Sequence, residues 1–169
     1  MTGRASLRSS APRRRGPAAD AAEAIDLGPL PQLVGYMLRR AQLAVFQDFM
    51  ELTAGLDIRP AHYSILAVVA ANRDLKQVQV CDALAIKRAN LVGLIDELEQ
   101  RGLLLRVQTL ADRRSRTLRL TKAGERLLAR LDDLLAQHER RLASRLGEDG
   151  KDKLLEFLAR LAVRGATEN

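Results

Sequence analysis

Basic side chains gather between Leu75 and Thr121, and their chemistry is that of binding a polyanion. One group is Lys87-Arg88-Ala89-Asn90, in which a guanidinium can read guanine and a carboxamide can read adenine through paired hydrogen bonds. The other group consists of arginines, which are Arg106, Arg113, Arg114, Arg116 and Arg119. With Lys76, both groups are candidates for binding nucleic acid.

The residues around the first basic group predict two short helices joined by a sharp turn. Apolar residues recur at helical spacing from Val80 to Leu84, and those from Leu91 to Leu98 form the stripe of an amphipathic helix. Only Ala85-Ile86 separates the two helices, and Gly102 is suited to end the second. This pattern is a helix-turn-helix, whose second helix enters the major groove with its N-terminal residues near the base edges.

The second basic group falls on two predicted strands. Residues 103–108 and 116–120 alternate between apolar and polar side chains, with a hairpin tip predicted at Ala111-Asp112-Arg113-Arg114. A basic two-stranded ribbon beside a helix-turn-helix is a wing. Thr121 is then well placed to N-cap a long helix.

Three motifs in this order resemble the MarR family of winged helix-turn-helix regulators. They are Leu98-Glu99-x-Arg101-Gly102-Leu103, Asp112-x-Arg114 and Leu120-Thr121-x-x-Gly124. The resemblance extends from Pro29 to Val163 and implies that Arg114 enters the DNA minor groove while Asp112 holds it in place. A narrow, negative groove attracts a guanidinium, although any one wing arginine could instead contact a phosphate or remain solvated. Gly93 replaces a side chain that is often polar in the family, which implies fewer base contacts.

The apolar patterns predict a mainly α protein with a small β-hairpin wing. Helices are expected at about 30–53, 60–71, 121–146 and 149–163, and the terminal ones carry more apolar surface than one small domain can bury. We therefore expect a homodimer, and the resembled family uses these helices as its interface. The expected organisation is a disordered basic tail at 1–28, a single MarR-like domain at 29–163 and a second tail at 164–169. Within the domain, residues 29–56 and 121–163 are the expected dimerisation helices, and residues 60–120 are the expected winged DNA-binding lobe.

The overall composition also favours nucleic acid as a binding partner. The 169 residues carry a net charge of +7 and a pI near 10.3, which suits double-stranded DNA, here a pseudo-palindromic operator. A basic protein of a membrane surface is the competing interpretation, but no stretch is long and apolar enough to span a bilayer. The single cysteine excludes an internal disulfide and fits a cytoplasmic location.

Other chemistry is less well supported by the sequence. Cys81 could be a redox switch, but the helix-turn-helix needs a small buried residue there, so core packing is expected. His62 and His138 have no companions at metal-ligand spacing, so no metal site is expected. No nucleophile–base pattern or glycine-rich phosphate loop occurs, and we predict neither an enzyme nor a bound cofactor.

Most of the aromatic residues lie in the first two predicted helices, which suggests an effector site. For Phe46 and Phe49 ordinary core packing is the simpler interpretation. Residues 28–40 and 86–90 further resemble MarR regulators that respond to hydroxycinnamoyl-CoA compounds, so the expected effector is an aromatic acyl-CoA. A free aromatic carboxylate is the alternative ligand, and a dimeric helical adaptor that does not bind DNA is the alternative function. The candidate ligand-binding residues are Tyr36, Arg39, Arg40, Phe46, Met50, His62, Tyr63 and Leu66.

Overall fold

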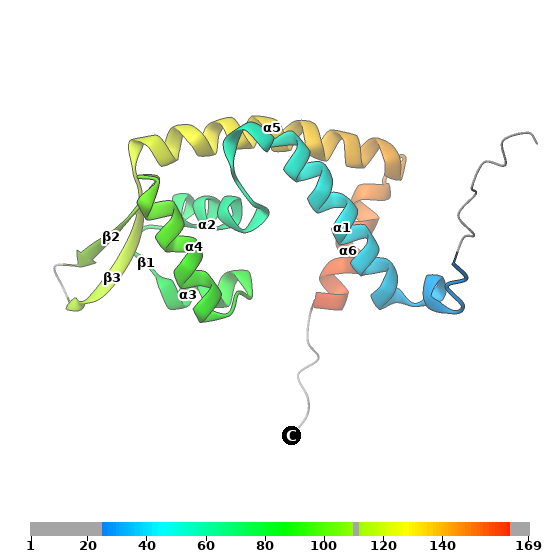
Figure 1. The fold of residues 1–169 in the computed structure, drawn as a ribbon, viewed down its shortest axis with the longest axis horizontal. Helices are drawn as coiled ribbons and strands as arrows, with labels where there is room; N and C mark the ends of the chain where they lie inside the picture. Colours follow the sequence, from blue (N-terminus) through cyan, green and yellow to red (C-terminus); the bar gives the residue numbers. More distant parts are fainter. Residues whose placement is uncertain (1–24, 110–111, 163–169) are drawn as a thin grey trace, which may run out of the picture. The chain divides into compact units, whose positions relative to one another are not determined.

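The computed structural model describes residues 25–109 and 112–162, and the side chains of Thr109 and of residues 112–115 lie outside its described part. Figure 1 shows the order of its helices and strands. They are η1 (Leu30–Gln32), α1 (Val34–Leu52), η2 (Ala54–Leu56), α2 (Pro60–Ala71), β1 (Leu75–Lys76), α3 (Gln77–Leu84), α4 (Arg88–Gln100), β2 (Leu104–Thr109), β3 (Asp112–Leu120), α5 (Lys122–Leu146) and α6 (Gly150–Ala162).

The chain passes from one compact unit to a second between Leu38 and Arg39, inside α1. In the first unit, the apolar side chains that follow residue 24 are exposed, among them Ile25, Leu33 and Val34. The predicted first helix is shorter than expected at its amino end. Leu33 is extended, with ψ 123°, so the turn of η1 does not continue into α1.

The sheet has one strand more than the predicted hairpin. Leu75 and Lys76, just before the predicted helix-turn-helix, form β1 and pair antiparallel with Leu118 and Thr117 of β3. The strand order is β1-β3-β2. The pairing satisfies backbone groups on the edge of β3 that a two-stranded wing would leave open. The predicted fold class, mainly α with a small β wing, is confirmed.

The hairpin of the wing is tighter than the sequence suggested. In the ladder between β2 and β3, Leu104 pairs with Leu120 and Thr109 pairs with Asp112, with a register shift between Gln108 and Thr109. The predicted tip at residues 111–114 was therefore wrong in extent. The backbone from Asp112 onward already belongs to β3, because strand pairing continues almost to the end of the ribbon.

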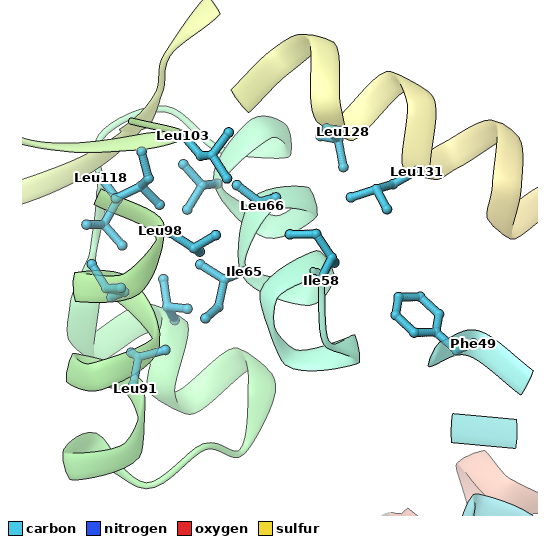
Figure 2. Packing of buried hydrophobic residues seen from close by; sticks show 14 residues of the cluster. Phe49, Ile58, Ile65, Leu66, Leu91, Leu98, Leu103, Leu118, Leu128 and Leu131 are labelled. Atoms are coloured by element: carbon cyan, nitrogen blue, oxygen red, sulfur yellow. The ribbon is translucent and has the colours of Figure 1, made fainter. Parts of the chain in front are cut away.

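One apolar core joins α2, α4, α5 and the sheet. Figure 2 shows Ile65 and Leu66 of α2 facing Leu98 of α4, with Leu118 on one side and Leu131 on the other. All five side chains are buried. Burying a Leu or Ile side chain stabilises a fold by about 1.5–3 kcal/mol, so this core fixes α4 and the wing relative to α2 and α5.

The start of α5 is held closely against Leu103, in the segment between α4 and β2. The Thr121 hydroxyl caps the helix by accepting a hydrogen bond from the Gly124 amide at 3.0 Å, as predicted, and the Thr121 amide donates to the Leu103 carbonyl at 3.1 Å. Gly124 is buried here, and a Cβ on it would lie 2.0 Å from the Leu103 carbonyl oxygen. The approach therefore requires glycine.

Candidate nucleic-acid interface

The two helices of the predicted helix-turn-helix meet at a left-handed residue. Ala85 has φ 51°, and the Ile86 amide donates to the Cys81 carbonyl at 3.1 Å, which closes the corner. Cys81 is half-buried against the core, in agreement with the packing role expected for it. Leu91 and Ile95 bury the inner face of α4. The opposite face of α4 is thereby left toward solvent.

The exposed beginning of α4 is strongly basic. Lys87 is the N-cap residue and its side chain makes no capping hydrogen bond, while Arg88, Ala89 and Asn90 follow it with exposed side chains. No acidic residue lies in the first turn. A helix N-terminus already carries partial positive charge and unpaired amides, so two cations there are unfavourable unless an anion joins them. This end of α4 suits a phosphate or a base edge.

An open hollow adjoins this end of α4. It is lined by Gln77 of α3, Arg88 and Asp96 of α4, Arg106 of β2 and Arg116 of β3. The structure thus brings the predicted residues Arg88, Arg106 and Arg116 together on one surface. Lys76 is exposed at the N-cap of α3 and does not line the hollow.

Arg106 has a different part in this surface from the one expected. Its guanidinium forms ion pairs with Asp96 and Glu99 of α4, and its amide donates to Glu99 Oε1 at 3.2 Å. Burial works to lower the pKa of Arg106, but the hydrogen bonds that its guanidinium donates to the two carboxylates outweigh this effect and raise the pKa. The donors that would meet DNA are therefore engaged within the protein. These contacts favour a supporting role, in which Arg106 ties the wing to α4 and neutralises two acidic residues beside the hollow.

The outer part of the wing can be described only in part. The side chains of Asp112, Arg113 and Arg114 lie outside the described residues, so the minor-groove role expected of Arg114 stays a prediction. Arg119, which was counted among the basic residues of the wing, places its Nη2 2.7 Å from Asp74 Oδ1. Its charge is partly balanced within the protein, whereas Arg116 is exposed.

A second, smaller hollow lies among the helices of the second unit and encloses about 160 Å³. Its walls come from the second half of α1, the first turns of α2 and the middle of α5. The lining residues are Val45, Phe46, Phe49, Pro60, Tyr63, Ser64, Leu135, His138 and Glu139. Aromatic and aliphatic groups dominate the hollow, with a few polar atoms among them, as is usual for small-molecule sites.

The candidate effector residues are only partly brought together here. Phe46 and Tyr63 line the hollow, and the Tyr63 hydroxyl donates to Asp132 Oδ1 at 3.0 Å. Burial raises the pKa of Tyr63, and the bond to Asp132 adds to the effect. Leu66 is fully buried in the core and does not line this hollow. The remaining candidates on α1 do not line it, namely Tyr36 in the first unit and Arg39, Arg40 and Met50 in the second.

His62 was expected to bind the ligand, but its ring connects α2 to α4 and does not line the hollow. Its Nδ1 accepts a hydrogen bond from the Arg59 amide at 3.3 Å, so the ring proton lies on Nε2, which is 3.0 Å from Glu97 Oε2. Burial lowers the pKa of His62, which favours this neutral form. A hydrogen bond from Arg59 lowers the pKa of Glu97. His62 therefore acts in helix packing and not as part of the hollow.

No pattern in the sequence indicates the pair that Asp48 and His138 form. The imidazole of His138 is 3% exposed, and its Nδ1 lies 2.6 Å from Asp48 Oδ2. Arg141 Nη2 lies 3.4 Å from the other oxygen of Asp48. The Phe49 ring meets the His138 ring edge-on. The two partners are 90 positions apart in the chain, and no local pattern links residues at such a separation.

The comparisons with known proteins agree with this geometry. The MarR family profile matches residues 56–115. A protein of Thauera aromatica, described as a transcriptional regulatory protein for the hcr operon, is 31% identical over 135 residues, which is 79% of this chain and 81% of that protein. The chain belongs to the MarR family. The expected resemblance is thereby confirmed, and the basic hollow at α4 lies where winged helix-turn-helix proteins of this kind bind DNA.

Solved structures of MarR family proteins are similar over most of the chain. The transcriptional repressor CouR bound to a 23-mer DNA duplex is 43% identical, with a TM-score of 0.78 over 82% of this chain and 99% of that one. CouR bound to p-coumaroyl-CoA is 39% identical, with a TM-score of 0.78 over 83% of this chain and 99% of that one.

Among the residues that the structure describes, no helix is long and apolar enough to cross a membrane. Within the same residues, no three His, Cys, Asp or Glu side chains gather as a metal ion would require.

Proposed function

We propose that this MarR family protein is a dimeric, DNA-binding transcriptional repressor that an aromatic coenzyme A thioester releases from its operator. The observation that carries the proposal is the exposed basic end of α4 beside Arg116, on a helix held rigidly by the core. Similarity to a repressor bound to a DNA duplex supports the same conclusion. We assign Lys87, Arg88 and Asn90 to the major groove.

Replacing Arg88 with Ala tests the DNA-binding surface. On a duplex selected from a random pool, we expect the logarithm of the affinity to fall less steeply with salt, by about one unit of slope, if Arg88 neutralises a phosphate. A loss of roughly 1–3 kcal/mol that is confined to one base pair is expected if it reads a base. Fluorescence anisotropy across a salt series measures both. Arg130→Ala removes the same charge from an exposed position on α5 and should leave both quantities unchanged.

Replacing Arg114 with Ala tests the wing in the same assay. We expect operator affinity to fall by roughly 1–3 kcal/mol, because a guanidinium in a narrow minor groove gains from the focused negative potential. Wild-type affinity for the Arg114→Ala variant at physiological salt would show that the wing arginine does not contribute.

A homodimer follows from apolar surface that a monomer would leave in water. Large apolar side chains are exposed on α6, including Leu154, Leu155 and Phe157, and others such as Met37 are exposed on α1. Two-fold symmetry would place the two α4 helices on half-sites about one helical turn apart, which requires a pseudo-palindromic operator. Sedimentation at micromolar concentration should give a dimer, and a stable folded monomer would exclude this arrangement.

The smaller hollow supports an aromatic effector. An apolar cavity of roughly 150 Å³ can hold one benzene ring, and this hollow encloses about 160 Å³ between Phe46, Phe49 and Tyr63. It therefore has room for the ring of a hydroxycinnamoyl group and not for the whole coenzyme. CouR, which is similar over most of the chain, binds p-coumaroyl-CoA.

The coenzyme portion gives the release of DNA a physical reason. Its phosphates would lie outside a ring-sized hollow and would need cations, which the exposed Arg39 or the basic hollow beside α4 can supply. Phosphates that bind the basic hollow compete directly with the phosphates of DNA for the same charges. A free aromatic carboxylate needs only one arginine and has no means of reaching that surface.

Calorimetric titration of the protein with three compounds tests the effector class. We expect p-coumaroyl-CoA to bind more tightly than either free p-coumarate or coenzyme A, because only the thioester uses both the hollow and the cations. If only the free acid binds tightly, the effector is an aromatic carboxylate and not the thioester.

A further inference from the structure

We infer that His138 recognises the 4-hydroxyl group of the effector's ring, and that Asp48 sets the tautomer and direction of the imidazole that this task requires. The inference rests on the proposed function, since it names the atom that selects among aromatic thioesters. It concerns a buried histidine that lines the smaller hollow and does not line the basic hollow beside α4.

The tautomer of His138 follows from its bond to Asp48. A carboxylate can only accept a hydrogen bond, so the Nδ1 of His138 carries the proton that it donates across 2.6 Å. In a neutral imidazole the other nitrogen, Nε2, is then an acceptor. Arg141 Nη2, 3.4 Å from Asp48 Oδ1, helps to orient that carboxylate. With the imidazole neutral, the pair therefore presents an acceptor at Nε2, which is what a phenolic hydroxyl group needs as a partner.

The other polar groups of the hollow already have partners in the protein. The Tyr63 hydroxyl donates to Asp132, the Ser64 hydroxyl donates to the Pro60 carbonyl at 3.1 Å, and Glu139 forms an ion pair with Lys151 at 2.6 Å. For His138 the structure gives a hydrogen bond at Nδ1 and, within the described residues, none at Nε2.

The Nε2 atom is also accessible to a ligand. Among the described residues, no fully buried side-chain nitrogen or oxygen lacks a hydrogen-bond partner. Since Nε2 has none, it is not sealed in the core, and the ring to which it belongs lines the hollow. The edge-on contact with Phe49 fixes the plane of the imidazole, so Nε2 keeps one direction.

A comparison of three thioesters with wild-type protein and a His138→Phe variant tests the inference. The ligands are p-coumaroyl-CoA, cinnamoyl-CoA, which lacks the hydroxyl group, and 4-methoxycinnamoyl-CoA, which has the oxygen but no proton to donate. Wild-type protein should bind p-coumaroyl-CoA roughly tenfold or more tightly than the other two, because a hydrogen bond is lost with either analogue. In His138→Phe, p-coumaroyl-CoA and cinnamoyl-CoA should bind within about threefold of each other.

The ratio of the affinities for p-coumaroyl-CoA and cinnamoyl-CoA shows whether His138 recognises the hydroxyl group or only packs the helices together. If His138 only joins α5 to α1, the variant weakens all ligands together and the wild-type ratio persists, which would overturn the inference. Wild-type protein that does not distinguish the ligands would overturn it as well. Gln137→Ala, at the exposed position next to His138, should keep the wild-type ratio. Failure of wild-type protein to bind any thioester would instead remove the proposed function on which the inference depends.

A crystal structure of the wild-type complex gives a readout that requires no variant to fold. With p-coumaroyl-CoA bound, we expect the phenolic oxygen within hydrogen-bond distance of His138 Nε2. A phenolic oxygen directed elsewhere would contradict the inference even if the affinities followed the expected order.

Discussion

Replacing Gly124 with Ala is expected to lower the free energy of unfolding by on the order of 3 kcal/mol. The new Cβ would lie 2.0 Å from the carbonyl oxygen of Leu103, which is backbone and cannot rotate away. That carbonyl also accepts the hydrogen bond of the Thr121 amide, so moving it disturbs the start of α5. Urea denaturation of both proteins at one fixed concentration measures the change, because the stability of a dimer depends on concentration.

The matched control is the same substitution at Gly93, in the middle of α4. A Cβ there meets no atom within 4 Å, so only helix propensity changes. Ala is favoured over Gly in a helix interior by about 0.8–1.0 kcal/mol, and Gly93→Ala should therefore stabilise the protein. Two glycines in helices of one protein are thus expected to respond in opposite directions. A similar small change for both substitutions would refute the close approach of α5 to Leu103.

Replacing Arg106 with Met is expected to weaken both folding and DNA binding. The change leaves Asp96 and Glu99 without their common partner on the side of α4 next to the basic hollow. Because the Arg106 side chain is 15% exposed, the loss of folding free energy should be roughly 1–3 kcal/mol, below that for a sealed pair. DNA affinity should fall on the order of tenfold, because two uncompensated carboxylates repel the phosphates. Denaturation and anisotropy measure the two effects.

Restoring neutrality distinguishes this explanation from direct contact between Arg106 and DNA. In the Arg106→Met background, Asp96→Asn with Glu99→Gln removes both acidic charges and leaves similar shapes. If Arg106 acts by neutralising its neighbours, these substitutions should recover most of the DNA affinity. Affinity that stays low would restore the direct DNA contact that the sequence suggested for Arg106.

The sequence was sufficient for the parts of the fold that depend on neighbouring residues. The apolar stripes of α4 and α5, and the cap at Thr121, are local patterns, and the structure has them close to the expected positions. The strand β1 was missed because two residues carry no periodicity, and their conformation is decided by pairing with Leu118 and Thr117. The extent of β3 likewise depends on its partner strand.

In the candidate sites, too, the sequence was sufficient for local patterns and not for contacts between residues distant in the chain. The exposed cations at the start of α4 could be expected from their order in the sequence. A list of arginines does not reveal that Arg106 is engaged by two carboxylates, one helical turn apart, on another element. Tyr63 lines a hollow, but the ring of its neighbour His62 lies beside Glu97, and a list of candidate residues does not reveal this difference. The pair of Asp48 and His138 is created only by the packing of α1 against α5.

Release of DNA by the effector tests the central claim most directly. A fluorescent duplex selected from a random pool is bound by the wild-type protein at physiological salt, and p-coumaroyl-CoA, free p-coumarate and coenzyme A are titrated separately. We predict a fall in anisotropy to the value of free DNA with p-coumaroyl-CoA at concentrations at which the other two compounds have no effect. Anisotropy that stays high with all three compounds, or a protein that retains no duplex from the pool, would contradict the account.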